Sequence, residues 1–430
     1  MKFPRIRERL FGGESGKVFR GMATLALGTG SARVIGLASI PLLTRIYSPK
    51  DYGLLSVFAA LVAIISPILS GRYVLAITLP RRDAAALNLL ALSLLLSIGT
   101  CISVGFAFWL FSPIILEWLS MQALLPWWWL VVLAAFAAAT YESLSMWATR
   151  SRAYSVIAKT QVTQAVLGET TKLVLGLLSL KPLGLLLGQL VSQCAGTGTL
   201  LRHFQADFRK GRRHLKRKRM LFLARYYRGF PLYRLPAVVV LALSVQAPLL
   251  LTAALFDPET TGQLGMALMA LALPVGILAD NMGRAYFAEI SRIGKRDPKS
   301  VRRLTRATIR RAFIISLPPA AVLLLAGKEL FSFAFGPRWE AAGLFASILS
   351  VYMLAQFMQR ATAAYLMSLY DGQKELLILN IQRLVMTVTC FWVGSHLDFT
   401  FERTLAIYSG LMSAHYVFSM FVAVRKIPAQ

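Results

Sequence analysis

The chain of 430 residues is 57% hydrophobic and only 15% charged, with a mean hydropathy of +0.60. These values exclude an ordinary soluble domain of this length and indicate an integral membrane protein. A net charge of +28 would suggest polyanion binding in a soluble protein, but here the lysines and arginines fall in bursts between apolar segments. That distribution is typical of membrane topology, so we expect no nucleic-acid partner.

Apolar segments long enough to cross a bilayer alternate with polar clusters along the chain. A hydrocarbon core of about 30 Å needs about 20 apolar residues per helix, and the sequence divides into about twelve such segments. The expected fold is therefore an all-α polytopic membrane protein. The predicted spans are residues 18–46, 52–78, 86–111, 124–149, 155–180, 183–204, 229–256, 260–289, 309–334, 340–370, 375–396 and 402–424.

The distribution of positive charge supports this division. With the N-terminus in the cytoplasm, most of the 47 lysines and arginines fall on the cytoplasmic side, above all in residues 1–20, 202–228 and 292–311. The opposite side carries few basic residues, mixed with acids. By the positive-inside rule, we expect an even number of helices with both termini in the cytoplasm.

The most basic stretch runs from Arg202 to Arg228 and contains a single acid, Asp207. We interpret it as a cytoplasmic linker that lies against anionic lipid head groups. The expected organisation is an N-terminal lobe of six helices (residues 1–204), this linker (205–228) and a C-terminal lobe of six helices (229–430).

A repeated turn supports two lobes. Ser48-Pro49 is followed by Gly53 after the first span, and Asp257-Pro258 is followed by Gly262 after the seventh. Each turn has a capping residue, a proline at the first helical position and a glycine four residues later, which suits an abrupt helix start. Two unrelated hairpins could share this chemistry. If the turns are repeats, the lobes are parallel copies related by an axis along the membrane normal.

Charged residues inside the spans are the candidate functional residues, because charge within a bilayer is costly and usually faces a cavity or a partner. The cations are Arg33, Arg72, Lys172, Arg284, Arg360 and Arg383, and the clearest acids are Glu142, Glu169 and Asp280. The balance is cationic. Arg33 is the best single candidate for lining a cavity, because no acid lies near it in its own helix.

These side chains also have structural alternatives. Glu169 and Lys172, spaced i and i+3, can neutralise each other on one helix face, and Asp280 and Arg284, spaced i and i+4, can do the same. Two cations nearer the cytoplasm can extend towards the head groups instead: Arg72 and Arg360.

Several motifs of soluble proteins are absent or uninformative. The chain has no P-loop and no catalytic constellation, and its histidines lack metal-ligand spacing, so we expect no catalytic residue, metal or cofactor. Gly28-Thr29-Gly30 lies inside a span and is interpreted as a packing feature. Three cysteines are expected to be buried, without disulfides: Cys101, Cys194 and Cys390.

Four segments carry a resemblance to a known family. Leu43–Gly53 resembles the signature L-x-R-x-x-x-P-x-D-Y/F-G of bacterial polysaccharide flippases, the Wzx-like exporters of the multidrug/oligosaccharidyl-lipid/polysaccharide superfamily. The other similar segments are Gly71–Pro80 with Arg81–Asp83 and Ala86–Leu89, then Phe230–Tyr233, and Leu273-Pro274 leading to Asn281–Phe287. Within Gly71–Pro80, Val74 stands where that family's pattern has glutamate, so no acidic role is carried over to it.

This resemblance implies a MATE-like fold with two lobes around a central cavity. It also implies a flippase for polyprenyl-pyrophosphate-linked oligosaccharides, such as O-antigen or exopolysaccharide repeat units, in the bacterial cytoplasmic membrane. The six intramembrane cations would then bind the anionic substrate, and the three acids are candidates for coupling to H⁺ or Na⁺. A polysaccharide polymerase is an implied partner.

Three alternatives remain at this stage. A multidrug antiporter of the same superfamily would need cavity acids to attract organic cations. A lipid II flippase is closer in chemistry, but known members have two further helices. A membrane scaffold or polymerase partner would carry out no transport.

Overall fold

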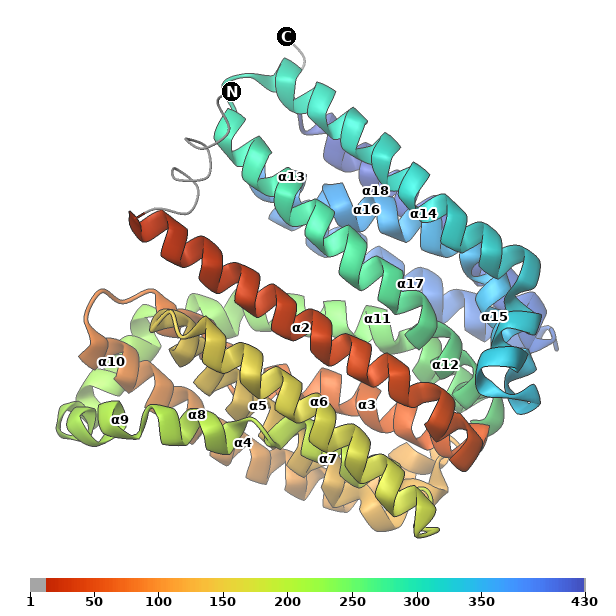
Figure 1. The fold of residues 1–430 in the computed structure, drawn as a ribbon, viewed down its shortest axis with the longest axis horizontal. Coiled ribbons are helices and arrows are strands. Elements are labelled where there is room, and N and C mark those ends of the chain that lie inside the picture. The colour runs from red at the N-terminus through yellow and green to blue at the C-terminus, as the bar shows by residue number, and fades with distance from the viewer. Residues whose placement is uncertain (1–12, 429–430) are drawn as a thin grey trace, which may run out of the picture. The chain divides into compact units, whose positions relative to one another are not determined.

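The structure is a computed structural model that describes residues 13–428. All regular secondary structure in this range is helical (Figure 1), which confirms the expected all-α fold. The helices are α2 (Gly13–Ile46), α3 (Pro49–Leu69), η1 (Tyr73–Thr78), α4 (Asp83–Trp118), η2 (Gln122–Trp127), α5 (Trp128–Arg150), α6 (Tyr154–Leu177), α7 (Leu183–Cys194), α8 (Thr197–His203), α9 (Gln205–Gly211), η3 (Arg212–His214), α10 (Arg217–Tyr226), η4 (Phe230–Arg234), α11 (Leu235–Leu255), α12 (Pro258–Pro274), η5 (Val275–Ala279), α13 (Asp280–Ile293), α14 (Pro298–Phe335), η6 (Pro337–Trp339), α15 (Glu340–Ile348), α16 (Ser350–Leu369), α17 (Gln373–His396) and α18 (Phe401–Arg425).

Eight helices in the described part of the chain are long and apolar enough to span a membrane, and the bent pair α15–α16 makes nine. The three other predicted spans are helical but more polar or interrupted. Lys159, Glu169 and Lys172 lower the hydropathy of α6, whereas α7 has only 12 residues. The span 260–289 is broken where α12 ends at Pro274 and the π-helix η5 follows, because proline supplies no amide donor to the helical ladder.

The chain divides into two compact units. The first comprises residues up to 47 together with 58–117 and 122–239, and the second comprises 48–57, 118–121 and 240–430. The division after Val239 falls inside α11, and the first turns of α3 belong to the second unit. The predicted limits of the lobes and linker, at 204 and 229, stay a prediction.

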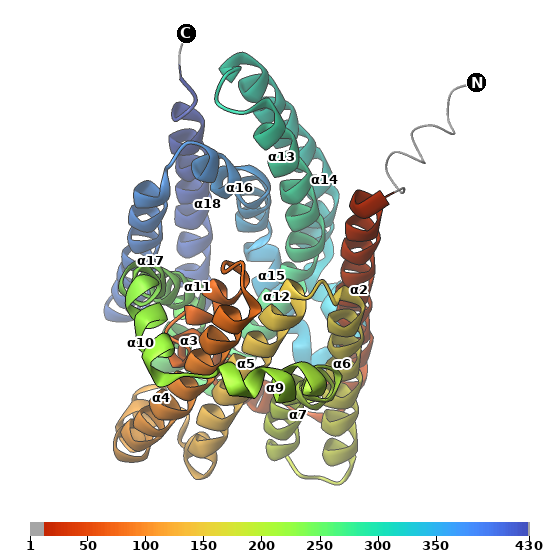
Figure 2. The same cartoon turned by 90° about the vertical axis from the view of Figure 1, so that its left-hand side faces the viewer.

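In the first unit, α2 packs along α6, as Figures 1 and 2 show. The backbones come close at Gly28, because a β-carbon there would lie 2.5 Å from the Ala158 Cβ and 2.7 Å from its Cα. At Gly30, one half-turn away, a β-carbon would meet no atom within 4 Å. Gly28 thus has the packing role expected of a small residue at a helix–helix contact.

Gly28→Leu is expected to lower the thermal unfolding midpoint of the purified protein. The new side chain must push α2 away from the backbone of α6, and overpacking of this kind costs about 1–3 kcal/mol. Gly30→Leu is the matched control and should leave the midpoint near that of the parent. Equal midpoints for the two variants would contradict this packing role.

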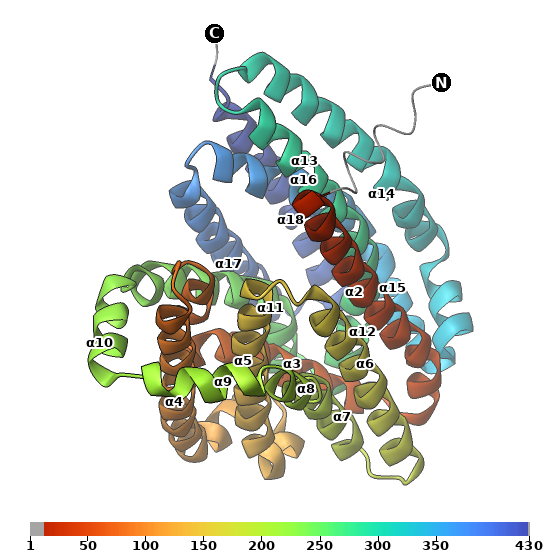
Figure 3. The same cartoon turned by 60° about the vertical axis from the view of Figure 1, so that its left-hand side comes forward.

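The basic linker is helical and is docked on the first unit. The buried Asn88 side chain donates to the His214 carbonyl (3.0 Å) and accepts from the Lys216 amide (3.1 Å). The Tyr73 hydroxyl donates to the Ala224 carbonyl at 2.9 Å. Apolar residues of α9 and α10 pack into the hydrophobic cluster of the first unit that contains Tyr73. Figure 3 shows these two helices running beside α4. The linker is therefore held to one unit by side chains in sequence-distant helices.

The two repeated turns start helices as expected. Ser48 and Asp51 exchange hydrogen bonds, with the Ser48 amide donating to Asp51 at 2.8 Å and the Asp51 amide donating to the Ser48 hydroxyl at 3.3 Å. Asp257 accepts from the amides of Glu259 and Thr260 at 2.8 and 2.9 Å. These bonds satisfy amides that have no partner within the first turn of a helix.

Within the second unit, the two turns lie against each other through their glycines. A β-carbon on Gly53 would overlap the Pro258 carbonyl oxygen, and one on Gly262 would overlap the Pro49 carbonyl oxygen. The contact is reciprocal, as two copies of one motif would make. Only glycine allows the backbones of α3 and α12 to approach this closely.

The cysteine prediction needs correction. All three cysteines are free, but Cys194 is exposed and Cys101 and Cys390 are only partly buried. An apolar side chain in a membrane protein can face lipid, which is as apolar as the protein interior. Position in an apolar segment therefore does not imply burial within the protein.

Candidate functional site

Glu169 and Lys172 form an ion pair inside the first unit. The Lys172 Nζ lies 2.8 Å from Glu169 Oε1, and the Ser39 hydroxyl donates to Oε2 at 2.7 Å. Lys172 is only 7% exposed, and the Tyr47 hydroxyl donates to its carbonyl at 2.7 Å. Glu169 and Lys172 therefore neutralise each other on one helix, as one of the predicted alternatives had it. The same carboxylate also connects α6 to α2 through Ser39.

Arg72 is paired with Glu142. Its Nη1 lies 3.1 Å from Glu142 Oε1, and its side chain is 14% exposed. Arg72 and the preceding Gly71 have φ values of 58° and 54°, a left-handed conformation that is uncommon for arginine. The pair connects the start of η1 to α5, so this arginine turns into the unit rather than towards head groups.

Asp280 is paired with Arg360 of α16. The guanidinium makes a two-pronged contact, with Nε at 2.6 Å from Oδ1 and Nη2 at 3.2 Å from Oδ2. The alternative pairing with Arg284 is wrong, since Arg284 is exposed and makes no ion pair with any described residue. A bidentate contact is the stronger arrangement, and it joins α13 to α16.

Arg383 lies in a polar cluster without a carboxylate. Its guanidinium donates to the Ser244 hydroxyl, and Nη1 donates to the Tyr416 hydroxyl at 3.3 Å. Gln356 donates to the hydroxyls of Tyr352 and Tyr416 at 2.8 and 3.3 Å. The cluster brings together α11, α16, α17 and α18, and only its arginine was identified from the sequence.

Arg33 projects from the middle of a membrane span. Its span covers Ala23–Ile46, so Arg33 lies about 15 Å along the helix from Ala23 at 1.5 Å per residue. The side chain is exposed and makes no hydrogen bond or ion pair with the described residues. A charge at this depth is costly in contact with lipid, which keeps Arg33 a candidate for lining a cavity.

The charges sort into two groups. Every candidate acid has a basic partner within 3.1 Å. Three candidate cations have no carboxylate partner among residues 13–428: Arg33, Arg284 and Arg383. An unneutralised cation within a membrane span attracts anions and repels organic cations. The same range holds no cluster of three or more His, Cys, Asp or Glu that could bind a metal.

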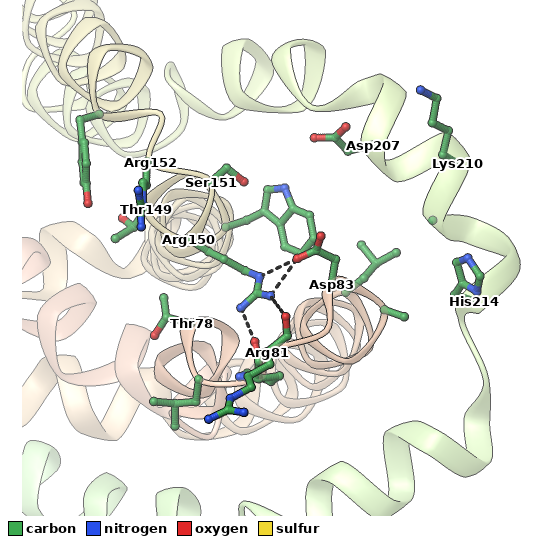
Figure 4. A pocket seen from close by; sticks show the side chains of 17 residues that line it. Thr78, Arg81, Asp83, Thr149, Arg150, Ser151, Arg152, Asp207, Lys210 and His214 are labelled. Atoms are coloured by element: carbon green, nitrogen blue, oxygen red, sulfur yellow. Dashed lines mark hydrogen bonds and ion pairs between the residues drawn. The ribbon is translucent and has the colours of Figure 1, made fainter. Parts of the chain in front are cut away.

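A pocket of about 990 Å³ lies in the first unit, beside the loops 78–84 and 149–154 and the linker. Figure 4 shows Arg150 at its centre, bound to Asp83. The Arg150 Nη2 lies 2.8 Å from the Asp83 carboxylate, and Nη1 donates to the Pro80 carbonyl at 2.6 Å. This arginine is therefore occupied in holding two loops together.

The remaining charges around this pocket are mixed. Arg81, Arg152 and Lys210 supply positive charge and Asp207 supplies negative charge, so basic residues outnumber the acid. None of the nine candidate site residues lines it. The pocket belongs to the junction between the first unit and its linker.

Comparison with known proteins agrees with these features. Residues 42–343 match the family described as polysaccharide biosynthesis protein. No curated protein sequence gives a significant match.

Solved structures share the fold at low sequence identity. An inward-facing MATE family multidrug resistance transporter of the MOP superfamily has a TM-score of 0.61 at 14% identity, over 99% of both chains. The lipid II flippase MurJ has a TM-score of 0.66 at 11% identity, over 93% of this chain and 87% of that chain. A MOP superfamily transporter from Pyrococcus furiosus, described as having reversed polarity of its binding pocket, has a TM-score of 0.61 at 15% identity, over 99% of both chains.

The family match covers most of the chain, and the likeness in fold extends over nearly all of it. Together with the apolar spans, these findings make the chain an integral multi-pass membrane protein with a MATE-like fold. It belongs to the family of polysaccharide biosynthesis proteins.

Proposed function

We propose that this protein is a flippase that moves a polyprenyl-pyrophosphate-linked oligosaccharide across the bacterial cytoplasmic membrane by alternating access. The observation that carries the proposal is the state of the intramembrane charges. Glu142, Glu169 and Asp280 are neutralised, whereas Arg33 and Arg383 have no carboxylate partner among the described residues. A pyrophosphate-linked glycan is anionic and suits guanidinium donors.

Membership of a polysaccharide biosynthesis family supports a glycan cargo. The likeness to a lipid II flippase supports a cargo attached to a lipid. In this proposal the prenyl chain stays in lipid while the cations guide the pyrophosphate. O-antigen and exopolysaccharide repeat units are the cargo classes that fit, with a polysaccharide polymerase as the partner that uses them.

A multidrug cation antiporter is the second candidate, because several structural neighbours carry that description. It would use intramembrane acids to bind an organic cation. All three candidate acids are already in ion pairs, which favours the flippase. The same acids remain proposed sites for coupling to H⁺ or Na⁺, since a transported proton can exchange with such a pair.

Deletion of the gene in its host tests the proposed function. We expect a lipid-linked oligosaccharide to accumulate in the cytoplasmic leaflet, and restoring the gene should clear it. Mass analysis of the extracted lipid identifies the glycan, and protection from an impermeant glycosidase reports the leaflet. Accumulation in the outer leaflet would indicate a polymerase partner instead, and an unchanged lipid pool would reject the proposal.

A further inference from the structure

A groove of about 320 Å³ lies between α14 and α18 in the second unit. Its lining combines three arginines with apolar side chains and contains no acid. The lining residues are Arg302, Thr305, Arg306, Ile309, Phe421, Val424 and Arg425. None of the candidate substrate-binding residues belongs to it, so the groove is separate from the charges considered above.

Helical spacing places these residues on two facing stripes. Arg302, Thr305, Arg306 and Ile309 follow the i, i+3, i+4, i+7 pattern of one helix face, and the α18 residues follow i, i+3, i+4. The Arg302 Nη2 donates to the Ile427 carbonyl at 3.2 Å, which ties the start of α14 to the end of α18. Figures 2 and 3 show both ends on the same side of the second unit.

The groove has a polar end and an apolar end. In α14 the two arginines precede Ile309, and in α18 Arg425 follows Phe421. Because the start of α14 lies beside the end of α18, the three arginines share one end of the groove, and Ile309 and Phe421 share the other. The helix α14 is kinked at Ala326, and its part before the kink, residues 298–325, is about 42 Å long, whereas the hydrocarbon core is about 30 Å thick. The basic start of α14 therefore extends beyond the core at the side predicted to be cytoplasmic, while Ile309 and Phe421 lie nearer the acyl chains.

The arginines are the donors that this groove offers. The Arg425 guanidinium carbon lies 4.1 Å from the Phe421 ring centroid, an arrangement that holds the charge over the apolar wall. Arg306 is exposed and makes no contact with a described acid. The Thr305 hydroxyl already donates to the Val301 carbonyl at 2.7 Å and contacts the Tyr286 hydroxyl, so it adds little to ligand binding.

We propose that this groove binds one anionic phospholipid, with its phosphate between Arg306 and Arg425 and an acyl chain along Ile309 and Phe421. Three positive charges without an acid fit a phosphate, and the adjoining apolar wall fits a lipid rather than a free anion. Basic pockets between transmembrane helices at the cytoplasmic face are suited to such head groups. The proposal concerns a bound membrane lipid and does not depend on which glycan is transported.

Native mass spectrometry of the full-length protein, titrated with dioleoyl phosphatidylglycerol, tests this site. The double variant Arg306→Gln/Arg425→Gln removes two charges and leaves the bond from Arg302 to α18 in place. The matched control, Arg303→Gln/Arg310→Gln, removes two exposed charges of α14 that do not line the groove. The first variant should weaken lipid binding about 25-fold, since each of the two arginines contributes about fivefold near the head groups.

The control variant should bind this lipid as the parent does, and dioleoyl phosphatidylcholine should bind weakly to all three proteins. Equal losses in both variants would overturn the proposal in favour of unspecific charge attraction. Equal binding of the two lipids would also overturn it, as would displacement of the lipid by glycerol phosphate at comparable concentration. If the double variant does not fold, Arg306→Gln alone carries the test, with an expected loss of about fivefold.

Discussion

Arg33→Ala is expected to abolish export of the proposed glycan cargo while the protein is still made and inserted. The exposed guanidinium lies in the middle of its span, and no described residue neutralises it. A hydrogen bond to a charged group contributes about 1.5–3 kcal/mol, so losing the contact should weaken phosphate binding about 10- to 100-fold. Export is measured as surface polymer in a deletion strain that carries the variant, with protein amount checked by immunoblot.

Two further variants separate a specific contact from a general effect of charge. Arg33→Lys keeps the charge but loses the planar fork of donors, so it should restore export only in part. Lys159→Ala removes an exposed cation from the second turn of α6 in the same unit, and this variant should export normally. Normal polymer output from Arg33→Ala would remove this residue from the substrate path.

Glu169→Gln should give the largest loss of stability. The change leaves Lys172, which is only 7% exposed, without its acid, and breaking a buried ion pair costs about 3–5 kcal/mol. The thermal unfolding midpoint of the purified protein measures the loss. Glu169→Gln/Lys172→Met removes both charges and should recover most of it, because the cost comes from the unpaired lysine.

Glu289→Gln is the matched control for this variant. Glu289 and Arg292 have the same i, i+3 spacing, but their side chains are 42% and 78% exposed. An exposed pair contributes about 0–1 kcal/mol, so the midpoint should hardly move. If both single variants lost the same stability, burial would not be the cause. Export by the folded double variant then tests whether the pair takes part in transport, since normal export would remove both Glu169 and Lys172 from the candidate site.

The sequence was sufficient to predict an all-helical membrane fold and nine of the twelve expected spans, because hydropathy directly reflects the bilayer. It also identified the two capped turns, since the Ser48 and Asp257 side chains accept from amides within three residues. These features depend on local chemistry or on the membrane, and neither requires knowledge of which helices are neighbours.

The charge pairs show where such reasoning ends. Glu169 and Lys172 are three residues apart, and their pairing was one of the predicted alternatives. Asp280 instead bonds to Arg360, which is 80 residues away, although Arg284 has a favourable spacing on the same helix. Helix packing decides between a local and a distant partner, and a single sequence carries no direct signal of that packing.

Asn88 illustrates a second limit. It lies in a segment that resembles the family pattern, which could have marked it as important. Its role, however, is to bind the backbone at His214 and Lys216, and backbone groups leave no trace in residue identity. Ser244 was missed for a similar reason, because a serine among apolar residues gives no sign that an arginine approaches it.

The reciprocal contact between Gly53 and Gly262 restricts how the two turns can change over evolutionary time. A side chain gained at either position would strike the proline carbonyl of the opposite turn, so each turn is part of the steric environment that selects the other. Compensation would require both backbones to move together. Sequences related to this one should therefore keep glycine at both positions or replace both, and should rarely change one alone.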